Sequence, residues 1–195
     1  MQDLKARKSE IRRKTLAGRD ALSDKERSEK SKAITERLLE FANFLEARIV
    51  LFYMNSGSEV ITEAMIRNAL EHEKIVALPL IDQKEKQIVP LKIDDIDRDV
   101  RPGYRRIREP IPQRCKVIPV KHINLAIIPG IAFDERGGRI GYGTGFYDQF
   151  IPLLDATTRK VALAFECQIV SQIPMEPHDR YVDIIVTEKR IIYKI

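Results

Sequence analysis

The chain has 195 residues, of which 34 are Lys or Arg, 29 are Asp or Glu and 44% are hydrophobic, and its formal net charge is +5. This length suits one domain, and the apolar share is that of a folded chain rather than a disordered one. Its 9 glycines and 10 prolines are too few for a collagen-like chain. No apolar run reaches the roughly 18 residues of a membrane-spanning helix, so we expect no membrane contact.

The chain start and the cysteines indicate a compartment. The first residues, Met1 to Lys14, are charged and lack the short apolar segment of a secretory signal. Cys115 and Cys167 lie far apart, with no Cys-x-x-Cys pattern and no histidine at metal-ligand spacing. These features favour a reducing cytoplasm, and we expect a cytoplasmic monomer.

Positive charge gathers in two segments of the chain. Met1 to Lys32 holds 11 Lys or Arg against 6 Asp or Glu, and Arg98 to His122 holds 8 against 2. Two such segments facing one cleft would attract a polyanion. Solvated helix faces are the alternative, because lysine and arginine are common on protein surfaces.

Two helices are predicted near the start of the chain. Ser23 and Glu26 form a capping-box pattern before an apolar stripe at helical spacing, which predicts an amphipathic helix over 25–45. A sparser stripe predicts an earlier helix over about 3–16, with Gly18 near its end.

Continuous apolar runs of strand length then predict an α/β fold. One run covers 48–54, and a second covers 75–81 after a helical stretch near 62–71. Strand, helix and strand at this spacing form a crossover unit, which favours a parallel sheet covered on both faces. Further strands are predicted at 87–93, 125–133, 160–165, 183–187 and 191–193. We expect a single domain over 1–195, with three layers and a mostly parallel central sheet flanked by helices.

One proline-rich segment, 102–119, interrupts this pattern and is predicted to be an irregular excursion from the sheet. It is too short to separate two domains. Long ordered loops of this kind often carry function.

The most informative segment is 134–148, which reads Asp-Glu-Arg-Gly-Gly-Arg-Ile-Gly-Tyr-Gly-Thr-Gly-Phe-Tyr-Asp. Gly141, Gly143 and Gly145 alternate just before a helical run that reaches Leu154. Glycines at this spacing allow positive φ and expose successive N–H groups, and the following helix adds its positive N-terminal end. The segment is therefore predicted to be a phosphate cradle, with a glycine-rich tight turn as the alternative.

Neither common phosphate motif describes this segment. A P-loop needs Gly-Lys-Ser or Gly-Lys-Thr, and the dinucleotide fingerprint needs glycine where Phe146 stands. Arg139 before the glycines and Asp148 after them favour anion binding over a simple turn.

The segment resembles the signature loop of the 5-formyltetrahydrofolate cyclo-ligase family, also called methenyltetrahydrofolate synthetases. The region 102–110 matches that family's middle loop only at Glu109-Pro110. Three further segments resemble the family in the right order: its N-terminal Lys-x-x-x-Arg at Lys8-Ser9-Glu10-Ile11-Arg12, its folate-site glutamate at Glu59, and its closing motif at Glu176-x-His178-Asp179-x-x-x-Asp183.

The resemblance implies an ATP-dependent, Mg²⁺-requiring cyclisation of 5-formyltetrahydrofolate to 5,10-methenyltetrahydrofolate, with release of ADP and phosphate. In this reaction the γ-phosphoryl group moves to the formyl oxygen, and nitrogen 10 attacks the resulting imidate phosphate. Mg²⁺ is the implied cofactor and ATP the co-substrate. The expected partners are these small molecules and no nucleic acid.

Residue roles follow from the same resemblance. The implied catalytic residues are Lys8, Arg12 and Arg139. The implied nucleotide-binding residues are Lys8, Ser9, Glu10, Ile11, Arg12, Arg139, Ile140, Gly141, Tyr142, Gly143, Thr144, Gly145, Phe146 and Tyr147. The implied folate-binding residues are Tyr53, Met54, Glu59, Tyr142, Gly143, Thr144, Gly145 and Phe146. The implied Mg²⁺ ligands are Asp148 and Asp179. His178 is left out of the catalytic set, because nitrogen 10 is itself the nucleophile.

Two other function classes compete with this interpretation. The cradle would also serve an enzyme acting on a sugar phosphate or a coenzyme A derivative. A nucleic-acid-binding protein is suggested by the pI of 9.2, although the chain lacks an RNA-recognition consensus or a zinc finger.

Overall fold

One large sheet organises the computed structural model, which describes residues 2–103 and 107–194. Its strands lie in the order β13 (Ile191–Tyr193), β12 (Ile184–Val186), β10 (Arg159–Leu163), β7 (Leu125–Ile127), β1 (Ile49–Leu51), β2 (Ile75–Asp82), β3 (Gln87–Ile93) and β6 (Lys116–Val117). The strands from β12 to β2 are parallel, and the strands outside them are antiparallel to their neighbours. The predicted mostly parallel sheet is confirmed.

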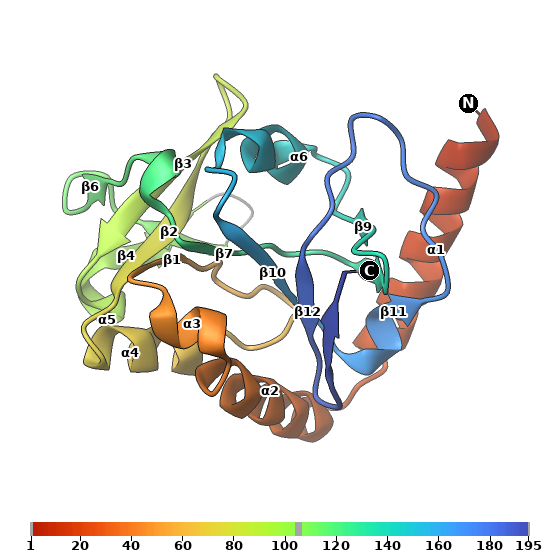
Figure 1. Cartoon of the computed structure of the whole chain (residues 1–195), viewed down its shortest axis with the longest axis horizontal. Coiled ribbons are helices and arrows are strands. Elements are labelled where there is room, and N and C mark those ends of the chain that lie inside the picture. Colours follow the sequence, from red (N-terminus) through yellow and green to blue (C-terminus); the bar gives the residue numbers. More distant parts are fainter. Residues whose placement is uncertain (1, 104–106, 195) are drawn as a thin grey trace.

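Helices cover both faces of this sheet. On one face lie α2 (Asp24–Leu39), α3 (Ala42–Glu46) and α4 (Glu63–Glu71), and on the other lie α6 (Phe146–Phe150) and the 3₁₀ turn η3 (Ile151–Leu153). Figure 1 shows these two groups on opposite sides of the strands. The predicted three-layer α/β domain is therefore confirmed.

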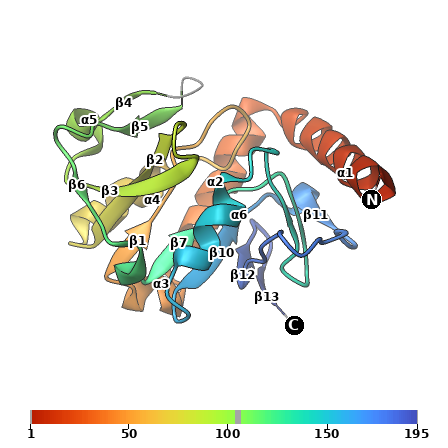
Figure 2. The same ribbon diagram turned by 90° about the horizontal axis from the view of Figure 1, so that it is seen from above.

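Smaller elements complete the fold beside the large sheet. A three-stranded sheet joins β8 (Ala132–Asp134) with β9 (Arg139–Ile140) and β11 (Ile169–Val170), and a hairpin joins β4 (Val100–Pro102) to β5 (Arg108–Pro110). Helix α1 (Gln2–Asp20) packs against β8 and the turn η4 (Glu166–Gln168). Figure 2 shows it along the edge of the molecule near β11. The remaining short elements are α5 (Ile96–Asp99) and η2 (Val120–His122).

Alternating side chains build the two halves of the core. In β1, Val50 packs on the side of α2 and Leu51 on the side of α6. The α6 side uses small side chains such as Ala77, Ala126 and Ala162, from β2, β7 and β10. Successive residues of a strand point to opposite faces, so each buried run serves both layers.

Two predicted helices have different limits in the structure. Helix α1 continues through Gly18 to Asp20, because a single glycine in a helix costs only about 1 kcal/mol relative to alanine and does not by itself end the helix. The helix predicted over 25–45 is instead two helices, since Phe41 is extended and turns into the core between them. The Ser23 capping box is present, but Leu45 is 60% exposed.

Some apolar runs are longer than the strands they contain, and the helix after the glycines is shorter than predicted. β1 ends at Leu51, and residues 52–54 are buried without lying in the sheet. The run 125–133 is two strands of different sheets, because Pro129 and Gly130 separate β7 from β8. The helical run toward Leu154 gives way to η3, which contains Pro152.

The segment 102–119 is also more regular than expected. It contributes the second strand of the β4–β5 hairpin and the edge strand β6. None of the described helices is long and apolar enough to cross a lipid bilayer.

Candidate active site

A deep cleft of about 1210 Å³ lies where the parallel strands end. Its walls include the residues that follow β1, Pro129 after β7, and Pro79 and Ile81 in the second half of β2. The chain crosses from β1 to β2 on one side, whereas β7, β10 and β12 extend the sheet on the other. Loops diverge at such a reversal of strand order, which makes it the usual ligand position in open α/β sheets.

Most predicted site residues line this cleft. They are Lys8, Arg12, Tyr53, Met54, Glu59, Arg139, Ile140, Gly141, Tyr142, Gly143, Thr144, Gly145, Phe146, Tyr147, Asp148 and Asp179. Ser9, Glu10 and Ile11 are not among the lining residues. Ile11 packs against a small cluster that includes Ile140, and Glu10 pairs with exposed Lys14.

The glycine loop from 141 to 145 has the open backbone that the sequence predicts. Gly143 and Gly145 have φ values of 86° and 74°, which L side chains rarely adopt. Gly141 is needed for a different reason, because a Cβ there would lie 2.8 Å from Nη1 of Arg139. No backbone N–H from 141 to 146 donates to a residue that the structure describes. The loop therefore offers successive donors to a ligand.

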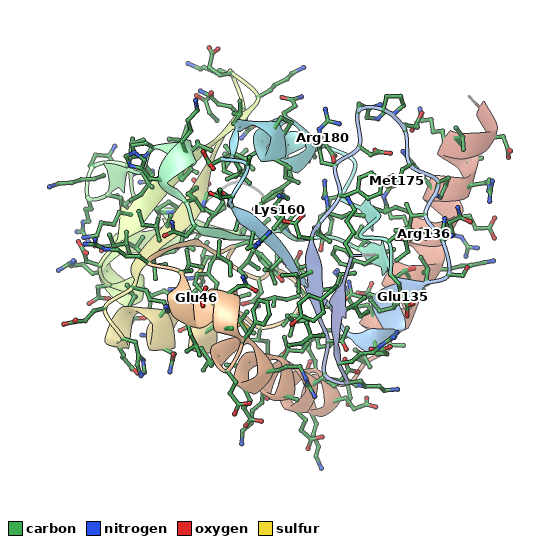
Figure 3. The ribbon with its side chains drawn as sticks, viewed as in Figure 1. Glu46, Glu135, Arg136, Lys160, Met175 and Arg180 are labelled. Carbon is green, nitrogen blue, oxygen red and sulfur yellow. The ribbon has the colours of Figure 1, made fainter. Side chains whose placement is uncertain are left out.

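Arg139 lies beneath this loop with one donor free. Its side chain is buried, Nη2 donates to Oδ1 of Asp148 at 2.6 Å, and Nη1 donates to the Pro129 carbonyl at 3.2 Å. Its Nε has no hydrogen-bond partner among the described residues. Arg180, labelled beside α6 in Figure 3, also donates its backbone N–H to Oδ1 of Asp148, at 3.1 Å. Buried donors are nearly always paired, so this Nε is a candidate donor to a ligand oxygen or to an ordered water.

Helix α1 brings two predicted cations to the same cleft. Lys8 donates to Glu176 at 2.6 Å and also to Asp179, and Arg12 donates from Nε to the Gly141 carbonyl at 3.0 Å. Burial alone would lower the pKa of Lys8, but its bonds to Asp179 and Glu176 outweigh this and raise it. The ammonium group therefore stays charged next to two carboxylates.

Glu59 lies deep in the opposite wall. It is 7% exposed, Oε1 accepts from the Tyr142 hydroxyl, and Oε2 accepts from the Ser56 N–H at 2.7 Å. Burial raises the pKa of Glu59, while the bonds from Tyr142 and Ser56 and the charge of Arg19 act in the opposite direction. Burial also raises the pKa of the Tyr53 and Tyr142 hydroxyls, which stay neutral.

Several lining residues were not singled out from the sequence. Arg19 is buried between Ser58 and Tyr142, and Asp20 accepts from Ser58. A signal for Arg19 existed, because it lies on the same face of α1 as Lys8 and Arg12 by helical spacing. Asp20 and Ser58 meet only through the tertiary fold, and no sequence pattern places them together.

The second basic segment contributes less to the cleft than the first. Among its described residues, Arg108 lines the cleft and also pairs with Glu63. Arg98 pairs with Asp99, and Arg114 donates to the Arg98 carbonyl, so both serve the β4–β5 region. Arg105 and Arg106 lie outside the described residues. The cation-rich wall is mainly that of α1.

The fold and the cleft define the class of protein: an α/β enzyme with a glycine loop, basic side chains and a buried glutamate around one ligand site. Residues 4–188 match the model of the 5-formyltetrahydrofolate cyclo-ligase family. The chain therefore belongs to that family, and it is a ligase of folate metabolism. This membership decides among the three classes that the sequence left open.

Relatives support the same assignment over most of the chain. A probable 5-formyltetrahydrofolate cyclo-ligase of Caenorhabditis elegans is 29% identical, with 98% of each chain covered. The NMR structure of Aquifex aeolicus 5,10-methenyltetrahydrofolate synthetase has a TM-score of 0.85 and 28% identity, covering 95% of this chain and 92% of that one. A synthetase structure from Mycoplasma pneumoniae has a TM-score of 0.75 at 18% identity, with 93% and 98% covered, and supports the fold.

Proposed function

We propose that this enzyme cyclises 5-formyltetrahydrofolate to 5,10-methenyltetrahydrofolate, using ATP and Mg²⁺ and releasing ADP and phosphate. The observation that carries the proposal is the row of backbone N–H groups from 141 to 146, which donate to none of the described residues and share one cleft with Lys8, Arg12 and Glu59. Such a cleft offers hydrogen-bond donors for phosphate oxygens and a hydrogen-bond acceptor for a pterin within one cavity. We also propose that it works as a cytoplasmic monomer, consistent with free thiols at Cys115 and Cys167.

The chemistry requires activation of a poor leaving group. Transfer of the γ-phosphoryl group of ATP to the formyl oxygen gives an imidate phosphate and ADP. Attack of nitrogen 10 on the adjacent carbon then closes the ring, and phosphate leaves with the former formyl oxygen. Phosphoryl transfer asks the protein mainly for positioning and charge stabilisation.

The basic side chains of the cleft suit that task. In the proposed complex, the loop N–H groups and the free Nε of Arg139 bind phosphate oxygens. Arg12 keeps its terminal nitrogens available, because its hydrogen bond to the Gly141 carbonyl uses Nε and no other described residue accepts from it. Lys8 would exchange its carboxylate partners for phosphate when the nucleotide binds.

Glu59 is the proposed acceptor for the pterin. A carboxylate has about four acceptor positions, and Tyr142 and Ser56 use one on each oxygen. The amino group and the neighbouring ring N–H of the pterin present two adjacent donors that match the remaining positions. Tyr53 and Met54 form apolar wall next to it.

The carboxylates of the cleft also fit Mg²⁺, which takes a few carboxylate oxygens and keeps several waters. Ligand atoms of Glu176, His178 and Asp179 lie within 4.8 Å of one another. Asp148 keeps its Oδ2 without a partner among the described residues. We propose Asp148 and Asp179 as the ligands. The bound ion would neutralise negative charge on the phosphates.

The test is turnover of purified enzyme with both substrates. We expect ADP release that requires 5-formyltetrahydrofolate, with the absorbance of methenyltetrahydrofolate appearing at the same rate. ATP hydrolysis that is independent of folate, or the absence of both products, would contradict the proposal. Glu59→Gln should raise the KM for the folate at least tenfold and leave that for ATP within about twofold, since it removes about 1.4 kcal/mol or more of pterin binding alone.

A further inference from the structure

Arg19 is a buried cation without a carboxylate in direct contact. It is 3% exposed, and no ion pair joins it to another of the described residues. Its guanidinium also lies over the ring of Tyr142, with 5.9 Å from Cζ to the ring centre. A buried charge is costly unless polar groups compensate it. Arg19 therefore needs hydrogen-bonding groups that connect it to a carboxylate.

Two hydroxyl groups supply that connection. Arg19 donates from Nε to Ser58 Oγ at 2.9 Å, and Ser58 donates to Asp20. It donates from Nη1 to the Tyr142 hydroxyl at 3.1 Å, and Tyr142 donates to Glu59. A guanidinium only donates, so each hydroxyl oxygen must accept from Arg19 and turn its own proton toward a carboxylate. Arg19 thereby fixes the direction of both O–H bonds.

We propose that Arg19 is a positioning residue, which directs the Tyr142 hydroxyl at Glu59 and so keeps Glu59 an ionised acceptor for the folate. The proposal rests on the folate role of Glu59 proposed above. Arg19 lines the same cleft, but its Nε and Nη1 are turned toward the two hydroxyls, so it acts on the folate through Tyr142.

The surroundings of Glu59 show why such help matters. Burial raises the pKa of Glu59, and the Tyr142 bond, the Ser56 bond and the charge of Arg19 oppose this. The titratable groups that face it are Arg19 from α1, Tyr53 after β1, and Tyr142 and Tyr147 from the glycine segment. Arg19 is the cation among them, since the tyrosines are neutral. Its removal takes away both a positive charge and the fixed orientation of the Tyr142 proton.

The ionised form is the one that the pterin needs. A protonated Glu59 would place an O–H where the ligand also presents an N–H, and two donors cannot bond to each other. Tyr142 lies between Gly141 and Gly143, so the hydrogen-bonded chain from Arg19 through Tyr142 to Glu59 includes a residue of the glycine loop. Helix α1 thus acts on the folate site through the backbone that we assign to the phosphates.

The first experiment measures Glu59 without any substrate. Protein labelled with ¹³C at glutamate carboxyl carbons is titrated by NMR, and the Glu59 signal is assigned by its loss in Glu59→Gln. We expect the midpoint of Glu59 to rise by about one pH unit in Arg19→Gln and in Tyr142→Phe, as expected when a buried carboxylate loses a charged or hydrogen-bonding partner. Arg13→Gln is the matched control, because Arg13 is exposed on the same helix and its loss should leave the midpoint unchanged.

The second experiment follows kcat/KM for 5-formyltetrahydrofolate against pH. We expect the acid limb to move upward with the Glu59 midpoint in both variants, with the KM for ATP within about twofold of wild type and partial rescue in Arg19→Lys. An unchanged midpoint, with activity lost equally at every pH, would show that Arg19 is only structural and would overturn the proposal. Where Arg19→Gln does not fold, Tyr142→Phe still tests the proposal, because it removes one oxygen from a partly exposed ring, and an unchanged Glu59 midpoint in it would also overturn the proposal. Failure of the wild type to turn over the folate would contradict the proposed function. The NMR titration needs no substrate, so it would still test whether Arg19 acts on Glu59 through Tyr142.

Discussion

At the scale of single residues, the glycines of the loop have different structural roles. Gly143 and Gly145 take up positive φ with open space above them, whereas Gly141 makes room for Arg139. The alternation in the sequence predicts an open loop, but it does not distinguish these two reasons. The distinction matters for substitutions, because a side chain at 143 would point into the space where we place the phosphates.

Gly143→Asp tests that placement directly. The substitution adds a negative charge beside the free N–H groups and costs about 1–2 kcal/mol of backbone strain at a φ of 86°. We expect the affinity for ATP-Mg²⁺, measured by titration calorimetry, to fall at least tenfold while the circular dichroism spectrum is kept. Gly18→Asp is the control, since that position is open and helical. Equal ATP affinity in both variants would show that the phosphates do not bind at this loop.

The sequence placed some site residues and missed others for identifiable reasons. Lys8 lies in a motif with fixed spacing and Glu59 follows a predicted strand, and the fold brings both to one cleft. Arg19 was hidden among the many cations of the first basic segment, although helical spacing puts it on the face of Lys8. Ser58 and Asp20 come together only when α1 docks on the β1–α4 loop. Tertiary contacts of this kind leave no local pattern.

At the scale of elements, helix α1 is the one whose position the site depends on. It carries four basic residues that line the cleft, Lys5, Lys8, Arg12 and Arg19, and it packs on η4 and β8. Its N-terminal half is attached through Lys8 to Glu176 and Asp179. Because the pKa of Lys8 is raised above its ordinary 10.5, this attachment is complete below pH 10.5 and is lost as pH rises through the higher folded value.

Lys8→Met should loosen this end of α1. Hydrogen bonds between charged groups are worth about 1.5–3 kcal/mol, so we expect backbone amides of the first α1 turns to exchange with deuterium about tenfold or more faster. Lys14→Met, which removes an exposed pair with Glu10, should change exchange less than threefold, because exposed ion pairs contribute little to stability. Equal protection in both variants would show that Lys8 does not anchor the helix.

Element boundaries were harder to predict than element types. Apolar composition identifies a buried segment, yet it cannot tell a strand from a buried loop, so residues 52–54 and 128–131 were counted as sheet. These loop residues follow β1 and β7, and Tyr53, Met54 and Pro129 among them line the cleft. The sequence signal failed where the chain leaves the sheet to build the site.

At the scale of the whole molecule, the order of the strands decides where the ligands meet. Chain segments on either side of the β1–β7 boundary run to opposite halves of the sheet, which leaves a cleft between them. The glycine segment crosses this cleft after β9, and the loop after β1 supplies Glu59 from the other side. A single cavity therefore holds both the N–H groups proposed to bind the phosphates and the carboxylate proposed to bind the pterin.

Thermal unfolding tests whether two ligands share this cavity. A ligand at a hundredfold excess over its Kd stabilises the native state by about 2.7 kcal/mol, which for a chain of this size raises Tm by roughly 5–10 °C. We expect ATP-Mg²⁺ and 5-formyltetrahydrofolate each to raise Tm, and the two together, with a non-hydrolysable ATP analogue, to raise it further. Glu59→Gln should lose the folate shift and keep the nucleotide shift. If the two ligands together raise Tm no further than one of them alone, they compete for one subsite. That result would contradict side-by-side binding along the glycine loop.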